Sequence, residues 1–181
     1  MSCQPAANRF SSALADPGRI QRQRLLTVLH RNANTAFGRS HDFADITTGE
    51  MFRARVPLTR WDELQPWVER VQRGEPGVLT TDKVTGLVPT GGSSGGKKLI
   101  PWTRSLASEF SAALAPWIVD LHDRYPASAD GPSYWSISPL ADVSPAGTAV
   151  PIGFDDDSAY LGRWCGGLIR TALVVPATVR H

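Results

Sequence analysis

The chain has 181 residues, which is enough for one domain or a large part of one. Hydrophobic residues make up 41% of it and charged residues 20%, a composition typical of a globular protein and unlike that of a disordered tail. The 19 lysines and arginines exceed the 17 acidic residues by only two, so no basic surface of the kind that binds nucleic-acid phosphates is expected.

The cysteines, the histidines and the N-terminus argue against disulfide-rich, zinc-binding and secreted proteins. Cys3 and Cys165 do not form a CxxC pair, and the four histidines are scattered singly, so neither a disulfide framework nor a zinc site is indicated. The first residues lack the basic and apolar regions of a signal peptide, and no apolar run approaches the roughly 18 residues of a membrane span. We expect a soluble, cytoplasmic protein with a frayed N-terminus.

Two helices are predicted near the start of the chain. Asp16 is a good N-cap and Pro17 suits a first turn, so a helix should run from here to about Arg31. Residues 32–38 are expected to lead the chain out of this helix. The capping-box spacing within residues 47–50 predicts a second, shorter helix.

A third helix is predicted from about residues 59–62. Pro66 should kink or split it, and Gly74 should end it. The apolar residues that share its face are Trp61, Leu64, Val68 and Val71. Nothing in residues 1–75 indicates chemistry, and this part is expected to be a mainly helical N-terminal segment.

Strands are predicted after Gly77. Residues 78–80 and 86–88 form short extended runs, and residues 98–102 return as a strand after a glycine-rich loop. The next helix carries an apolar stripe at helical spacing that we expect to be core: Leu106, Phe110, Ala113, Leu114, Trp117, Ile118 and Leu121.

The last part of the chain continues the alternation of strand and helix. Residues 133–138 alternate as a strand should, and Asp155–Asp157 precede a helical stretch at about 159–175. Residues 76–181 are therefore expected to be an α/β segment, and the fold class α/β.

The segment from Pro89 to Pro101 carries the chemistry. It holds four glycines, two serines and two lysines between predicted strands. Glycines let successive N–H groups turn inward to bind an anion, Ser93 and Ser94 can donate to phosphate oxygens, and a lysine can offset the charge. A flexible hairpin turn with solvated lysines is the alternative.

The Walker pattern is a further alternative that the sequence excludes. Gly91 to Lys97 has the Walker spacing, but Lys98 follows where a hydroxyl residue would bind magnesium. A Walker loop also enters a helix directly, whereas residues 99–101 are apolar, extended and end in proline.

The loop from Thr90 to Lys98 resembles the Ser/Thr/Gly-rich phosphate loop of adenylate-forming enzymes, with Lys98 at the place of the closing lysine. Further segments are similar to the Gretchen Hagen auxin-responsive family of acyl acid–amido synthetases, most of all to its bacterial members. These segments are residues 34–38, 41–43, 52–58, 74–80, 99–101, 134–139 and 152–156. The likeness covers the chain from about Arg24 onward.

This resemblance implies the N-terminal part of the large domain of an adenylate-forming enzyme, in which a helical cap is followed by strand, loop, strand and helix. Members of the family run to several hundred residues. We therefore expect an N-terminal fragment, inactive by itself, in which residues 1–75 and 76–181 are parts of one truncated domain.

The resemblance also implies the function. The expected enzyme is an ATP-dependent ligase that joins a carboxylic acid to an amine or amino acid through an acyl-adenylate, with ATP and Mg²⁺ as cofactors and neither nucleic acid nor membrane as partner. The residues expected to bind ATP are Thr90, Gly92, Ser93, Ser94, Gly95 and Lys98. Gly91 stands where the family usually has serine, which removes one phosphate donor.

Several roles stay open at this point. No catalytic residue or metal ligand is assigned; Lys97 and Asp155–Asp157 are expected to face water. The sequence does not identify the acid or the amine. The alternative functions are a non-catalytic phosphate- or nucleotide-binding module and an inactive remnant.

Overall fold

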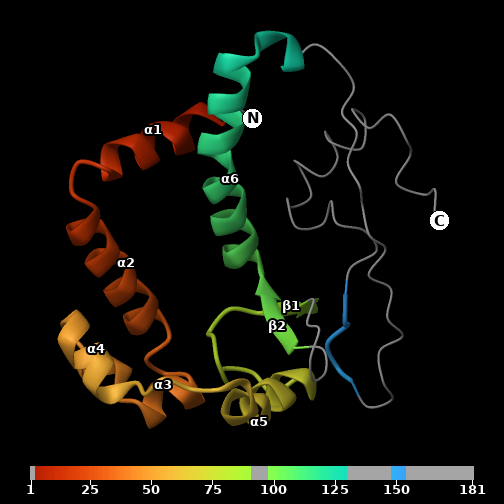
Figure 1. Ribbon diagram of the computed structural model, residues 1–181. Coiled ribbons are helices and arrows are strands. Elements are labelled where there is room, and N and C mark those ends of the chain that lie inside the picture. Colours follow the sequence, from red (N-terminus) through yellow and green to blue (C-terminus); the bar gives the residue numbers. More distant parts are fainter. Residues whose placement is uncertain (1–2, 91–97, 130–147, 154–181) are drawn as a thin grey trace. The chain divides into compact units, whose positions relative to one another are not determined.

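The computed structural model describes residues 3–90, 98–129 and 148–153 (Figure 1). These residues group into two compact units. One contains residues 16–90, 98–103 and 148–152, and the other contains residues 3–15 and 104–129. The predicted division between residues 75 and 76 stays a prediction.

The first unit combines short helices with a two-stranded sheet, which confirms the mixed helix-and-strand fold class. Its elements are α2 (Pro17–Arg31), α3 (Ala36–Ser40), the 3-10 helix η1 (Phe43–Asp45), α4 (Gly49–Arg55), α5 (Trp61–Gln72), β1 (Val84–Thr90) and β2 (Lys98–Thr103).

Two of the predicted helices begin with side-chain caps, the second of them one residue after Thr47, where the capping-box spacing begins. The carboxylate of Asp16 accepts a hydrogen bond from Arg19 N at 3.0 Å, with Pro17 in the first turn of α2. The Thr48 hydroxyl accepts from Met51 N at 3.2 Å and caps α4. Each cap satisfies one of the backbone N–H groups that a helix start leaves without an intrahelical partner.

Pro66 does not split α5, which runs unbroken to Gln72. Proline here removes one intrahelical hydrogen bond, that to the carbonyl of Asp62, and the helix continues around it. The chain then leaves the helix through Gly74, whose φ of 85° suits glycine, as predicted.

The segment that follows α2 contains a helix that was not predicted. Asn32 ends α2, but α3 begins at Ala36, inside the expected loop. Thr35 is fully buried, and its hydroxyl donates to Asn32 O at 2.7 Å and accepts from Gly38 N at 2.9 Å. The turn is therefore built by a buried side chain that bonds to backbone on both sides.

Two apolar clusters form the core of this unit. Leu29, Phe43 and Ile46 join α2 to η1, with Met51 and Phe52 of α4 packed against them. The second cluster is formed by Val71, Val78, Leu87 and Val150, with Trp67, Leu79, Val84, Leu99 and Ile152 around it. It therefore joins α5, both strands and the segment 148–152.

Residues 78–80 do not form a strand, although their apolar pattern predicted an extended run. Their side chains serve packing instead: Val78 is almost fully buried in the second cluster. On the other side of β1, an isolated parallel bridge joins Leu87 to Ile152, and Leu87 N donates to Pro151 O at 2.8 Å.

The second unit contains α1 (Gln4–Ala13), α6 (Arg104–Arg124) and the 3-10 helix η2 (Pro126–Ala129). The frayed N-terminus expected from sequence is wrong from Gln4 on, because α1 packs along α6. Small buried residues, Ala7 and Ala115, allow the close approach.

The apolar stripe of α6 was expected to be core, and this is wrong: none of its seven residues is buried, and three of them are exposed. Phe110 is 40% exposed and Trp117 is 55% exposed. Helical spacing shows which residues share a face, but burial depends on what covers that face. Within the described part of the chain, no helix is long and apolar enough to cross a membrane.

Gly38→Ala should lower the free energy of unfolding by about 1–3 kcal/mol, because its Cβ would lie 2.1 Å from Asn32 O and 2.9 Å from the Thr35 hydroxyl. Gly18→Ala, in the exposed first turn of α2, is the control: its Cβ would find no atom closer than 3.6 Å. The control should be neutral or stabilising by up to about 1 kcal/mol. Urea unfolding of both variants checks this, and equal midpoints would contradict the steric argument.

Candidate phosphate-binding hairpin

The candidate site is the antiparallel hairpin of β1 and β2 (Figure 1). Thr90, the last residue of β1, pairs with Lys98, the first residue of β2. The seven residues between them, 91–97, therefore connect two chain ends that the sheet holds side by side. This confirms the predicted order of strand, loop and strand.

The register explains how both strands tolerate proline. Leu87 points its N–H away from β2, toward Pro151, and its partner across the hairpin is Pro101. Hydrogen-bonded and non-hydrogen-bonded pairs alternate in an antiparallel ladder, so Pro89, two residues on, also lies at a position that donates nothing to the hairpin. Thr90 and Lys98 then form a hydrogen-bonded pair at the base of the loop.

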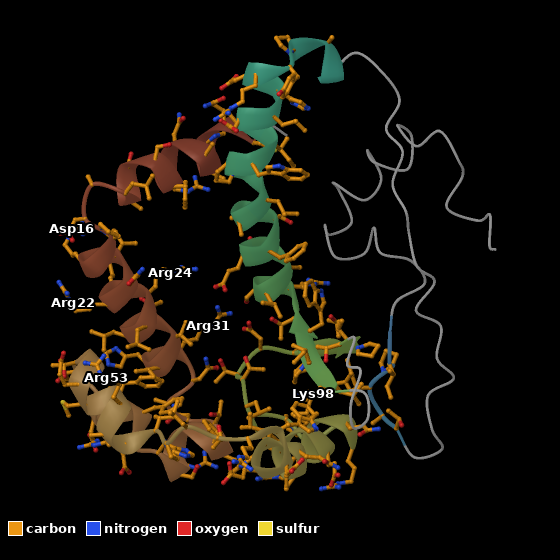
Figure 2. All side chains as sticks on the ribbon, in the orientation of Figure 1. Asp16, Arg22, Arg24, Arg31, Arg53 and Lys98 are labelled. Atoms are coloured by element: carbon orange, nitrogen blue, oxygen red, sulfur yellow. The ribbon has the colours of Figure 1, made fainter. Side chains whose placement is uncertain are left out.

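The same alternation decides which side chains share a face. Leu87 and Leu99 belong to the second core cluster. Successive side chains of a strand point to opposite faces of the sheet. Thr90 and Lys98 are each next to a residue on the core face, so their side chains project from the opposite face, together with Ile100. Lys98 is exposed at the loop end of β2 (Figure 2).

Four of the six residues predicted to bind ATP lie outside the described residues: Gly92, Ser93, Ser94 and Gly95. Lys97, which was expected to face water, also lies there. The structure places the two ends of the predicted site, Thr90 and Lys98, opposite each other. The roles of all six residues stay predictions.

A hollow of about 530 Å³ lies beside the chain that leads into β1. Val71, Val78, Val84 and Val150 give it apolar walls, and the other lining residues are Gly74, Glu75, Pro76, Gly77, Leu79, Thr80, Thr81, Asp82, Lys83 and Ala149. Neither Thr90 nor Lys98 is among them, so the hollow is distinct from the base of the loop.

Arg70 forms an ion pair with Glu75, one of the residues that line this hollow. Its guanidinium makes two hydrogen bonds to Glu75, one of them from Nε at 2.8 Å, and its Cζ lies 5.1 Å from the centre of the Trp67 ring. Hydrogen bonding to Arg70 holds the pKa of the Glu75 carboxyl below the usual 4.5. The pair lies at the surface, so it contributes little to stability.

A set of contacts that the sequence did not predict joins the α2–α3 junction to residues 77–82. Arg31 forms an ion pair with Asp82, and the side-chain oxygen of Asn32 accepts from Thr81 N at 3.1 Å. These partners are separated by 49 to 51 residues in the chain. No local pattern relates residues so far apart, which is why sequence reasoning missed them.

Among the described residues, no group of three or more histidine, cysteine or acidic side chains could hold a metal ion. Cys3 is a free thiol. Asp155–Asp157 and Cys165 lie outside the described residues.

A family model described as the GH3 family N-terminal domain matches residues 6–150. The chain belongs to the GH3 family. This confirms the resemblance to the auxin-responsive synthetases, while a bacterial type within GH3 stays a prediction.

Individual GH3 relatives are longer than this chain. A rice (Oryza sativa subsp. japonica) protein named jasmonoyl–L-amino acid synthetase GH3.5 is 27% identical over 107 residues, covering 58% of the chain and 18% of the relative. An Arabidopsis thaliana protein named indole-3-acetic acid-amido synthetase GH3.5 is 31% identical over 84 residues, covering 45% of the chain and 14% of the relative. The chain thus spans less than a fifth of either relative.

A solved GH3 structure has the same fold. It is described as the AtGH3.15 acyl acid amido synthetase in complex with 2,4-DB, and it superposes with a TM-score of 0.72 at 19% sequence identity. The match covers 97% of this chain and 31% of that chain. At this identity the likeness establishes the fold alone.

In a carboxyl NMR titration, Glu75 should titrate below pH 4.5, and Arg70→Gln should move its pKa upward because the main cause of the shift is removed. Glu50 is the internal control. Its pKa is also lowered, but by hydrogen bonds from its own backbone N–H and from the Thr48 hydroxyl, so Arg70→Gln should leave it unchanged.

The sign of the pH dependence follows from the same shift. Because the folded-state pKa of Glu75 lies below the unfolded one, the small stabilisation by the pair is complete above about pH 4.5. It is lost as the pH falls through the folded-state value. A Glu75 titration that is the same with and without Arg70 would contradict this assignment.

Proposed function

We propose that the chain carries the ATP phosphate-binding hairpin of an acid–amine ligase that acts through an acyl-adenylate. The observation that carries the proposal is the pairing of Thr90 with Lys98 at the base of a Gly/Ser-rich loop in a GH3 N-terminal domain. Relatives named as synthetases of jasmonoyl–amino acid and indole-3-acetic acid amides support a carboxylic acid and an amino acid as substrates.

The proposed reaction has two steps. A carboxylate oxygen attacks the α-phosphorus of ATP, forming an acyl-adenylate and releasing pyrophosphate. The amine nitrogen then attacks the acyl carbon, forming the amide, releasing AMP and losing a proton. The first step concentrates charge on the leaving pyrophosphate, so preorganised donors at the β- and γ-phosphates stabilise its transition state.

The hairpin suits this role on three grounds. Pairing of Thr90 with Lys98 fixes both ends of the loop before a ligand arrives, which lowers the entropy lost on binding. Both side chains project from the face of the hairpin opposite the core. Lys98 is exposed there, where its ammonium group can reach a phosphate.

We assign charge stabilisation to Ser93, Ser94, Gly95 and Lys98, and shaping of the loop to Thr90 and Gly92. Hydroxyls and backbone N–H groups would donate to phosphate oxygens, and the lysine would offset their charge. Mg²⁺ would accompany ATP through its phosphates.

A binding module without turnover is the second candidate. It is favoured by one observation: the described residues frame the phosphate loop at Thr90 and Lys98, and none of them is assigned to the acid or the amine. A hairpin that binds phosphate does not by itself supply the groups that bind an acid and an amine. An inactive remnant would bind neither.

The test is a carboxylate-dependent exchange of pyrophosphate into ATP. It is run on this chain and on the protein extended by any reading frame that continues it, with a panel of acids that includes jasmonate and indole-3-acetate. Exchange in either form supports the ligase. Mg·ATP binding without exchange in both forms supports the binding module, and absence of both supports a remnant.

Lys98→Ala should lower the exchange rate about 10- to 100-fold, because it removes one charged hydrogen bond to phosphate. The matched control is the neighbouring Lys97→Ala, which should have little effect if that side chain faces water. A loss with Lys97→Ala but not with Lys98→Ala would contradict the assignment of the closing lysine.

A further inference from the structure

Residues 77–82 lead the chain into β1, and burial alone does not hold them in place. Within this described segment Val78 is the one buried residue, and residues 79–83 are partly or fully exposed. The 530 Å³ hollow lies along the same stretch. The position of this segment therefore depends on its polar contacts.

Most of those polar contacts reach the junction of α2 and α3. Ala36 N donates to Gly77 O at 2.8 Å and Phe37 N donates to Val78 O at 3.0 Å. The two ends of the segment are thus held differently: the first by these backbone bonds, the last by side chains.

Thr81 and Asp82 make the side-chain contacts. Thr81 N donates to Asn32 Oδ1 at 3.1 Å, and the Thr81 hydroxyl donates to Arg31 O at 3.2 Å. Arg31, which Figure 2 labels at the end of α2, forms an ion pair with Asp82. We call these contacts, together with the two backbone bonds to Gly77 and Val78, the α2–α3 clamp.

The clamp acts directly before the hairpin. Asp82 lies two residues ahead of Val84, the first residue of β1, and its N–H donates to the Thr80 hydroxyl at 3.1 Å. The ladder is irregular between Val84 and Gly86, so the first pair of the hairpin is offset from the others. The direction in which the chain enters this irregular start sets the direction of β1.

We propose that the α2–α3 clamp orients the phosphate-binding hairpin, with Arg31 and Asp82 as positioning residues for ATP. This inference rests on the proposed function and extends it: the helical segment before the loop determines how well the loop meets the phosphates. Neither residue touches ATP in this proposal. They act through β1, on the loop that follows Thr90.

The ion pair is partly exposed, with 46% of the Arg31 side chain and 23% of the Asp82 side chain accessible. Water therefore screens it, and the effect of breaking it should be moderate. Arg31→Gln and Asp82→Asn should each weaken Mg·ATP binding about three- to tenfold, with little change in the KM of the carboxylic acid. The reversed pair, Arg31→Asp with Asp82→Arg, should restore most of the affinity.

Arg53→Gln is the matched control. Arg53 forms an exposed ion pair with Glu50 on α4, three residues away along the same helix. In the described part of the chain this pair lies outside the clamp to residues 77–82. Like Arg31→Gln, this variant removes one positive charge and one ion pair. It should leave Mg·ATP affinity unchanged.

Two measurements separate this inference from the proposed function. Mg·ATP affinity is measured by titration, and amide hydrogen exchange is followed in β1 and β2. In the Arg31→Gln and Asp82→Asn variants the hairpin amides should exchange faster than in wild type, while α4 is unaffected. Unchanged exchange and affinity in both variants, or faster hairpin exchange and weaker Mg·ATP binding in the Arg53→Gln control as well, would overturn the clamp. If the wild-type chain and its extended form bind no Mg·ATP, but the hairpin amides of both variants still exchange faster than those of wild type, the clamp stands and the proposed function is overturned.

Discussion

Leu87 is the residue on which the arrangement of the hairpin depends. Its side chain is fully buried among Val71, Val78 and Val150, and its N–H donates to Pro151 O at 2.8 Å. One residue thus ties the sheet to α5 through packing and to the segment 148–152 through a backbone hydrogen bond. The burial fixes which face of β1 turns toward the core, and the hydrogen bond fixes which edge of β1 faces the segment 148–152.

This orientation of β1 in turn places the candidate site. Because the N–H of Leu87 points away from β2, the prolines of both strands lie at positions that donate no hydrogen bond within the hairpin. Thr90 and Lys98 then form a hydrogen-bonded pair. A shift of one residue would turn these two side chains toward the core. Polar contacts at the α2–α3 junction complete the support by holding the chain just before β1.

Some of the fold could be predicted from short stretches of sequence. Asp16 and Pro17 predicted α2, because capping is a contact between residues close together in the chain. The glycine-rich loop between two apolar runs predicted the hairpin. The helix α3 was missed because its N-cap, Thr35, is buried and bonds back to Asn32 as well as forward to Gly38. The membership of the GH3 family was carried by the order and spacing of many short segments.

The sequence by itself determined the starts of α2 and α4, the strand–loop–strand order and the family. Only the tertiary structure decided which apolar faces are covered, leaving Phe110 and Trp117 exposed, and which distant residues meet, as Arg31 and Asp82 do. The reason is physical: caps and periodicity depend on residues within a few positions of each other. Burial and the contacts between residues 50 positions apart depend on how the whole chain packs.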